Sequence, residues 1–278
     1  MKRPFLQDEA FLADVGGYTG GEDHFRVWWL GQSGFLLQWR RHRLLFDPYL
    51  SDSLTEKYAN TDKPHVRITE RVVAPELLTG IELVTSSHNH TDHLDAATLL
   101  PLRSANPGVR LVIPEANREF VAQRLQCDPD WPYGMSDGDS LTLGEFTFHA
   151  VPAAHEQVEP AFLGYVVRFG KFTVYHPGDT VLYDGMAERL RPFDIDLAVL
   201  PINGRKPERR VAGNLNGLEA ATLAREAAVR IAIPCHYDLF EFNTALPDDF
   251  VRECDRTGQR YRVLSNGEGF TFSKEQAL

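Results

Sequence analysis

The chain has 278 residues, of which 43% are hydrophobic, 24% charged and 11% aromatic, and its formal net charge at pH 7 is -10. This composition is typical of a globular protein and excludes the disordered, collagen-like and coiled-coil classes. The negative charge argues against nucleic acid or an anionic membrane as a partner, because both would repel the chain at long range.

The three cysteines, Cys127, Cys235 and Cys254, are far apart and form no CxxC pair, so they predict neither a disulfide framework nor a thiolate zinc site. The N-terminus lacks the apolar stretch of a signal peptide, and no run of about 18 apolar residues predicts a transmembrane helix. We therefore expect a cytoplasmic protein with a small molecule as its partner. The sequence leaves the oligomeric state open, a homo-oligomer included.

The first 23 residues are expected to be a flexible N-terminal segment, because residues 14–23 (DVGGYTGGED) are rich in glycine and acidic side chains. Short segments rich in aromatic and aliphatic residues follow. They are separated by turn-forming residues and predict an antiparallel meander over 25–30, 35–40 and 42–47.

Further along the chain, an apolar strand ends at SSHNHTDH (86–93), and a helix is predicted directly after it over 96–106. The histidine-rich segment is therefore expected at the C-terminal end of a strand. The predicted elements that follow are a strand at 109–114, a helix at 115–126, and strand pairs within 140–153 and 163–176.

The second half of the chain alternates helices and strands. The predicted elements are a helix at 179–191, a buried strand at 194–202, a helix at 216–229 with Asn216 as its N-cap and Glu219 three residues later, and a strand at 230–234. A strand-rich first half and an alternating second half predict an α/β fold, a four-layered αββα sandwich of two mixed β-sheets. We expect one domain over residues 1–278.

The segment SSHNHTDH places four potential metal ligands, His88, His90, Asp92 and His93, within six residues. Histidine and aspartate both suit zinc, manganese or iron. His88 and His90 would share one side of an extended segment, while Asp92 and His93 could reach a second ion. The alternative is a polar loop whose histidines only cap the following helix.

A two-metal site needs ligands from elsewhere in the chain, and three candidates follow predicted strands: His155 in VPAAHE, Asp179 in YHPGDT and His236 in IPCHYD. In a sandwich these strand ends can converge on one rim, where Asp179 could bridge both ions. Taken singly, each residue could instead be an ordinary loop, turn or strand-end residue.

This set of motifs resembles the metallo-β-lactamase superfamily of dinuclear hydrolases over residues 25–270: HxHxDH, a lone histidine, a Gly-Asp pair and a late histidine. The resemblance implies two metals, the first held by His88, His90 and His155, the second by Asp92, His93 and His236, with Asp179 bridging.

A narrower resemblance comes from WLGQSGFLL, YHPGDT, PINGR, GNLNGLEA and IPCHYDLF, which look like the branch that contains L-ascorbate-6-phosphate lactonase. The chain is shorter than the lactonases of that branch. That branch favours manganese, whereas the wider superfamily favours zinc. The resemblance implies a hydrolase acting on an ester or lactone.

A basic loop, NGRKPERRVAGN, lies between a predicted strand and helix of this acidic protein. Arginine binds phosphate or carboxylate through a planar fork, and backbone NH groups at a helix start favour an anion. The loop predicts a site for a small anionic substrate. The alternative is a solvated charged loop. The candidate residues are Asn203, Arg205, Arg209, Arg210 and Asn214.

The expected mechanism uses two metals to lower the pKa of a bridging water, whose hydroxide attacks a carbonyl or phosphorus. Asp92 could orient the hydroxide as well as bind metal, and Asp179 takes part through its bridging position. His176 or Tyr237 could protonate the leaving group, although His176 could equally be structural. Asp47 is expected beneath the metals, where it could orient a ligand histidine, or to be a turn residue before Pro48.

Two other functions remain open at this point. The superfamily includes phosphodiesterases and nucleases, against which the charge of -10 argues. The chain could also be a non-catalytic binding protein that depends on metal, although the complete ligand set argues for catalysis.

Overall fold

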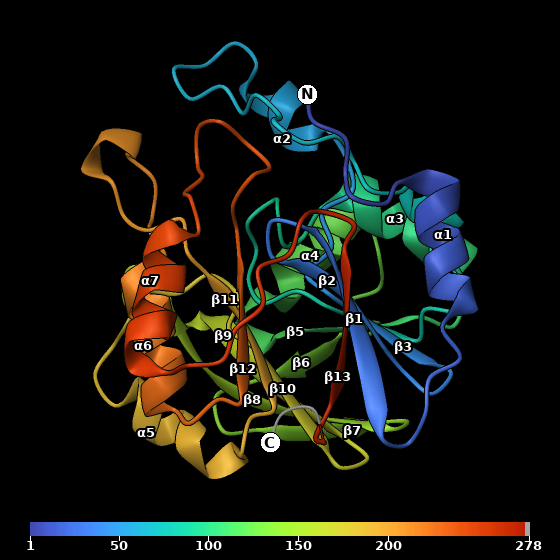
Figure 1. Cartoon of the computed structure of the whole chain (residues 1–278). Helices are drawn as coiled ribbons and strands as arrows, with labels where there is room; N and C mark the ends of the chain where they lie inside the picture. The colour runs from blue at the N-terminus through green and yellow to red at the C-terminus, as the bar shows by residue number, and fades with distance from the viewer. Residues whose placement is uncertain (276–278) are drawn as a thin grey trace.

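The computed structural model describes residues 1–275; the last three residues of the expected domain, 276–278, lie outside the described residues. Two mixed β-sheets pack face to face, and helices cover the outer face of each sheet (Figure 1). The predicted αββα sandwich is therefore confirmed.

The first sheet contains seven strands, and it begins with the predicted meander. β1, β2 and β3 pair antiparallel, whereas β3 to β6 pair parallel. The strand order is β13 (Gly269–Ser273), β1 (His24–Gly31), β2 (Gly34–Trp39), β3 (His42–Phe46), β4 (Leu83–Thr85), β5 (Arg110–Pro114) and β6 (Tyr133–Met135).

The second sheet contains six strands, and it is also mixed. β12, β11 and β10 pair parallel, while the pairs from β10 to β7 are antiparallel. The strand order is β12 (Ile231–Cys235), β11 (Leu197–Pro201), β10 (Phe172–His176), β9 (Val158–Phe169), β8 (Phe146–Ala154) and β7 (Ser140–Leu143).

The tryptophan pair in β1 shows how the layers are packed. Successive strand side chains point to opposite faces, so Trp29 enters the core between the sheets while Trp28 packs on the outer face of the first sheet. Both side chains are fully buried. Helices α1 (Asp8–Gly17), α3 (Ala96–Ala105) and α4 (Arg118–Leu125) cover that outer face.

The expected flexible segment over residues 1–23 is wrong for its central part, which forms helix α1. The glycines that suggested a loop, Gly16 and Gly17, lie at the C-terminal end of this helix. Phe11 and Val15 are buried in the outer core, so α1 is held by packing against the first sheet.

The helices of the second half cover the outer face of the second sheet (Figure 1). The predicted helix at 216–229 is α6 (Gly217–Glu226), and the expected capping box of Asn216 and Glu219 is present. The helix expected at 179–191 is restricted to α5 (Met186–Leu190). Residues before it are held by the end of β8 instead, since the Val181 N–H donates to the Ala154 carbonyl.

Besides α1, four helices and strands of the structure were not predicted from the sequence. They are the short helix α2 (Ser53–Tyr58), the helix α7 (Asp248–Thr257) and the two edge strands of the first sheet, β6 and β13. Helix α7 packs against α6. Short 3₁₀ helices occupy Pro75–Leu77, Glu115–Asn117, Arg191–Phe193 and Pro207–Arg209.

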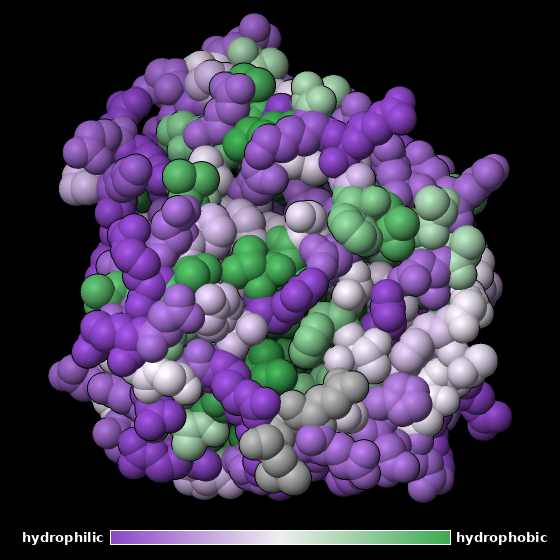
Figure 2. Space-filling view, viewed as in Figure 1, coloured by the Kyte–Doolittle hydropathy of each residue, from purple (hydrophilic) through white to green (hydrophobic). Residues whose placement is uncertain are grey.

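Within residues 1–275, no helix is both long enough and apolar enough to cross a membrane. Hydrophilic residues cover most of the face seen in Figure 1, with hydrophobic residues gathered toward its middle (Figure 2).

Candidate metal centre

The candidate ligands follow the C-terminal ends of four strands, one in the first sheet and three in the second. The histidine-rich segment follows β4, His155 follows β8, Asp179 follows β10 and His236 follows β12. Because the two sheets pack face to face, these strand ends meet at one edge of the sandwich. The structure brings all seven predicted ligands together there in two groups.

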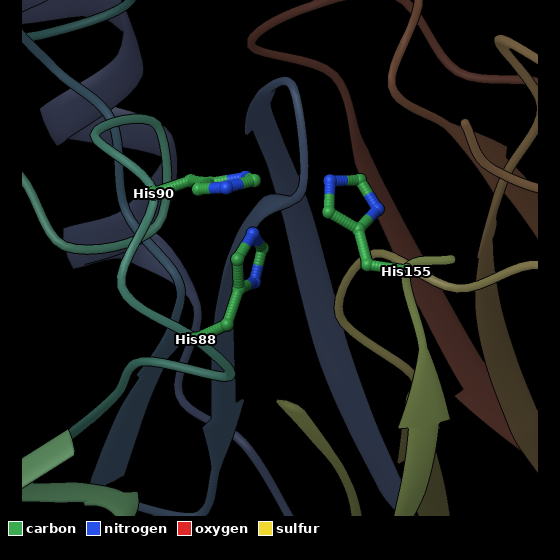
Figure 3. A group of neighbouring side chains, drawn as sticks. All are labelled: His88, His90 and His155. Carbon is green, nitrogen blue, oxygen red and sulfur yellow. The ribbon is translucent and has the colours of Figure 1, made fainter. Parts of the chain in front are cut away.

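The first group consists of His88, His90 and His155, whose rings converge on one space (Figure 3). Their ring centroids lie 4.6 Å (His88–His90), 4.9 Å (His90–His155) and 5.3 Å (His88–His155) apart. His155 donates its Nδ1–H to the carbonyl of Gly213 at 3.1 Å, which leaves Nε2 free as a metal ligand.

The second group consists of Asp92, His93, Asp179 and His236. His93 Nε2 lies 3.3 Å from Asp179 Oδ1, and His236 Nε2 lies 3.4 Å from Asp179 Oδ2. Asp179 Oδ2 is also 3.9 Å from His155 Nε2 of the first group. Asp179 therefore lies between the two groups, where a bridging carboxylate would be.

The two groups differ in their proton affinity. Burial lowers the pKa of His88, His90 and His155, so these imidazoles stay neutral, the form that binds metal. In the second group burial also acts to lower the pKa of His236, but the Asp179 and Asp92 carboxylates outweigh it and raise this pKa to about 9.

The same carboxylates raise the pKa of His93 well above its usual value against the effect of burial. Burial in turn acts to raise the pKa of Asp179, but His236 and His93 hold it well below its usual value. Without metal, this group therefore carries protons that a cation would displace.

A second layer of contacts fixes His93. His93 donates Nδ1–H to Asp47 at 2.7 Å, and neither side chain is exposed. Asp47 also accepts hydrogen bonds from Thr85 Oγ1 at 2.7 Å, from the Ser87 N–H at 3.1 Å and from the Ser87 hydroxyl. The expected contact of Asp47 with a candidate ligand histidine is therefore present.

Glycine is required at position 178, next to Ser87. Gly178 has a φ of +66°, and a Cβ there would collide with the side chain of Ser87. The segment between β10 and Asp179 can therefore cross Ser87 only if residue 178 has no side chain.

The donor set fits metal ions. His88 Nε2, His93 Nε2 and Asp179 Oδ1 are buried and make no hydrogen bond within the described part of the chain. Buried polar atoms rarely lack a partner. The ligand atoms of each group lie within 4.8 Å of one another, so each group can surround one cation.

The contacts of His176 and Tyr237 do not favour the expected roles in proton transfer. His176 donates Nε2–H to the Ser33 carbonyl at 2.7 Å, and its Nδ1 accepts the Gly178 N–H at 3.2 Å, so both ring nitrogens are occupied. The Tyr237 hydroxyl donates to the Leu264 carbonyl at 2.7 Å, and burial raises its pKa. Both side chains are bonded to backbone groups of the surrounding fold.

The arginines of the expected anion site in the basic loop are bonded to other groups of the protein. Arg205 pairs with Glu219, and Arg210 pairs with Asp62 on the exterior. Arg209 donates to the carbonyls of Asn203 and Thr244. These contacts depend on which acidic and carbonyl groups the fold places nearby.

The two asparagines of the predicted anion site are buried and bonded to each other, Asn214 Nδ2 donating to Asn203 Oδ1 at 3.0 Å. Neither residue lines the cavity beside the metal ligands. From the basic loop, that cavity is lined by Val211 and Ala212 instead.

The cations that do line this cavity were missed in the sequence. They are Lys57, Lys63 and Arg124, from α2, the loop after it and α4. Gln32, in the turn between β1 and β2, was also missed, although its side chain contacts Asp92. The sequence feature that could have indicated Gln32 is its position within the motif WLGQSGFLL.

Comparison with known proteins shows the family. A family model described as a beta-lactamase superfamily domain matches residues 42–237. A UPF0173 metal-dependent hydrolase from Opitutus terrae is 32% identical over 257 residues, covering 87% of this chain and 98% of that relative.

Solved structures agree on the fold. Igni18, a metallo hydrolase from Ignicoccus hospitalis, superposes with a TM-score of 0.66 at 22% identity, covering 90% of this chain and 99% of that chain. An isothiocyanate hydrolase from Delia radicum gut bacteria gives a TM-score of 0.70 at 16% identity, covering 89% and 99%. This chain therefore belongs to the beta-lactamase superfamily and, within it, to the UPF0173 family of metal-dependent hydrolases.

Proposed function

We propose that this metal-dependent hydrolase is dinuclear and cleaves a small anionic ester or lactone. One observation carries the proposal: the two ligand groups open into a cavity of about 440 Å³ that is also bordered by cations. A cavity of this size suits a small molecule. The choice of an ester or lactone as substrate depends on the sequence motifs, because the family match indicates a metal-dependent hydrolase without a substrate.

The proposed ligands are His88, His90 and His155 for one metal and Asp92, His93 and His236 for the other, with Asp179 shared. Ligands of this kind, without thiolate, accept zinc, manganese or iron. When bound, the metals would supply an activated water and a Lewis acid for the developing oxyanion.

The chain's own residues provide orientation and charge. Asp92 and Asp179 remain carboxylates at neutral pH, because the neighbouring histidines lower the pKa of each against the effect of burial. They can therefore accept a hydrogen bond from the attacking water. His155 is held by Gly213, so its ring cannot turn away from the site.

Three cations support an anionic substrate. Arg124 donates to the carbonyls of Asn89 and Leu94, and its guanidinium lies 4.4 Å from the centroid of the Phe120 ring. Lys63 donates to the Arg210 carbonyl at 2.6 Å. Lys57 is exposed, and its Nζ lies 5.1 Å from the centroid of the Tyr58 ring.

Leu54, Tyr58, Phe120 and Val211 also line the cavity, so an anionic group joined to an apolar body would match it. The proposal includes a cytoplasmic site of action, since the three cysteines are all free.

A substrate panel tests the proposal. The metal-loaded protein would be assayed with sugar-phosphate lactones, uncharged lactones, an isothiocyanate, bis-p-nitrophenyl phosphate and short RNA. We expect anionic lactones or esters to be cleaved faster than uncharged ones, and the Asp179→Ala variant to be inactive. Turnover of phosphodiesters without lactones would replace the proposal with a phosphodiesterase, and metal binding without any turnover would favour a binding protein.

A further inference from the structure

Gln32 reaches the metal centre from the turn between β1 and β2. Its Nε2–H donates to Asp92 Oδ2 at 3.1 Å, and the same nitrogen lies 3.4 Å from His236 Nε2. Gln32 is 1% exposed. Glutamine is an uncommon metal ligand beside histidine and aspartate, so its place among these ligands requires an explanation.

The backbone of Gln32 is fixed from two sides. Its carbonyl accepts the His236 N–H at 3.0 Å and the Trp29 indole N–H at 2.9 Å. Gln32 also has a φ of 47°, in the left-handed region that a residue with a side chain seldom adopts. Such a conformation persists where its surroundings determine it, so the side chain starts from a defined position.

The contact is made with the oxygen of Asp92 that faces the second metal group. Asp92 Oδ2 lies 3.5 Å from His236 Nε2 and 3.8 Å from His93 Nε2. An ionised carboxylate only accepts hydrogen bonds, so the amide nitrogen of Gln32 must be the atom that faces it. One lone pair of this oxygen is then bonded to Gln32, and the other is free for a metal.

A second buried glutamine shows how a purely structural one is bonded. Gln38 donates Nε2–H to the carbonyls of Tyr18 and Arg40, and its oxygen accepts from Arg43 at 2.8 Å. In Gln32, by contrast, the buried amide oxygen has no hydrogen-bond partner in the described part of the chain. The amide of Gln32 is thus bonded toward the metal ligands and not into the surrounding fold.

We propose that Gln32 is a positioning residue for the second metal, holding Asp92 Oδ2 so that a single lone pair of this oxygen points to the cation. The inference depends on the dinuclear site of the proposed function, but it concerns metal affinity and requires no turnover. Groups that orient metal ligands typically change affinity by about 10- to 100-fold when they are removed.

Competitive zinc titration against a chromophoric chelator tests this role. Gln32→Met keeps the length of the side chain and removes its donor, so we expect one of two zinc-binding steps to weaken about tenfold while the other is unchanged. Gln38→Met is the matched control and should leave both steps within about twofold of wild type. Gln32→Asn, which is too short to reach Asp92, serves as a second variant should Gln32→Met not fold.

A double-mutant cycle with Asp92→Asn distinguishes positioning from general damage. If Gln32 acts through Asp92, adding Gln32→Met to Asp92→Asn should change zinc affinity by less than about twofold. An unchanged affinity in Gln32→Met, or an equal loss in both backgrounds, would overturn the inference. If wild type shows no turnover but Gln32 and Asp92 remain coupled in zinc affinity, only the proposed hydrolysis is rejected.

Discussion

Asp47 is the buried carboxylate that holds His93, and its replacement by asparagine tests the layer beneath the metals. The carboxylate accepts hydrogen bonds from Thr85, from the N–H and hydroxyl of Ser87, and from His93. Asparagine has nearly the same shape but presents an NH₂ group in place of one oxygen. Whichever way the amide is turned, this NH₂ group faces a donor.

The expected cost has two parts. Breaking a buried charged contact costs about 3–5 kcal/mol in the free energy of unfolding, and asparagine, which keeps one acceptor, should fall at the lower end. A ligand histidine without its orienting carboxylate should lose about 10- to 100-fold in metal affinity. This loss equals about 1.4–2.7 kcal/mol in binding free energy.

Urea unfolding of the metal-free protein and competitive zinc titration would measure the two parts separately. Asp196→Asn is the control, because Asp196 is equally buried and accepts from the Thr173 N–H at 2.9 Å, but at the opposite end of β11 from the metal ligands. It should lower stability and leave zinc affinity unchanged. Equal zinc affinity in Asp47→Asn and wild type would refute the reasoning.

Further predictions address the backbone, the protons and the substrate. Gly178→Ala should lower both the thermal midpoint and the zinc affinity, because its Cβ collides with Ser87. Gly258→Ala, at a φ of 68° in open space, should lower only the free energy of unfolding, by about 1–2 kcal/mol. Equal zinc affinities in the two variants would contradict this prediction. Zinc must displace a proton from His236, whose pKa is raised to about 9, and another from His93, whose pKa is also raised. The affinity of the second group should therefore fall by at least about tenfold per pH unit below pH 9, and a constant affinity between pH 7 and 8 would count against the assignment. Lys57→Ala should raise KM for an anionic substrate about fivefold at constant kcat, and should change KM for an uncharged analogue by less than about twofold. The control Arg205→Ala should change KM for the anionic substrate by less than about twofold. Equal KM changes for both substrates in Lys57→Ala would exclude charge recognition.

The sequence predicted the layers and the seven candidate ligands, which the structure brings together, because both follow from local patterns. His88, His90, Asp92 and His93 lie in one segment, so their proximity needed no tertiary information. His155, Asp179 and His236 each follow a predicted strand, and strand ends of packed sheets share an edge. The resemblance to a known superfamily then joined these separate candidates into one set.

What the sequence did not predict depends on partners distant in the chain. Arg210 pairs with Asp62 and Arg205 pairs with Glu219, and neither arginine lines the cavity beside the candidate ligands. His176 was a candidate for proton transfer in the sequence, but in the structure its Nε2–H donates to the Ser33 carbonyl. Gln32 contacts Asp92, which lies sixty residues later in the chain.

Metal content per chain tests the dinuclear centre most directly. Wild-type protein and Asp179→Ala would be loaded with zinc, separated from free metal by gel filtration and measured by elemental analysis. We predict about two zinc ions per chain in wild type and fewer than one in the variant, because Asp179 lies between both ligand groups. One ion per wild-type chain, or two retained in Asp179→Ala, would contradict a shared carboxylate at a two-metal site.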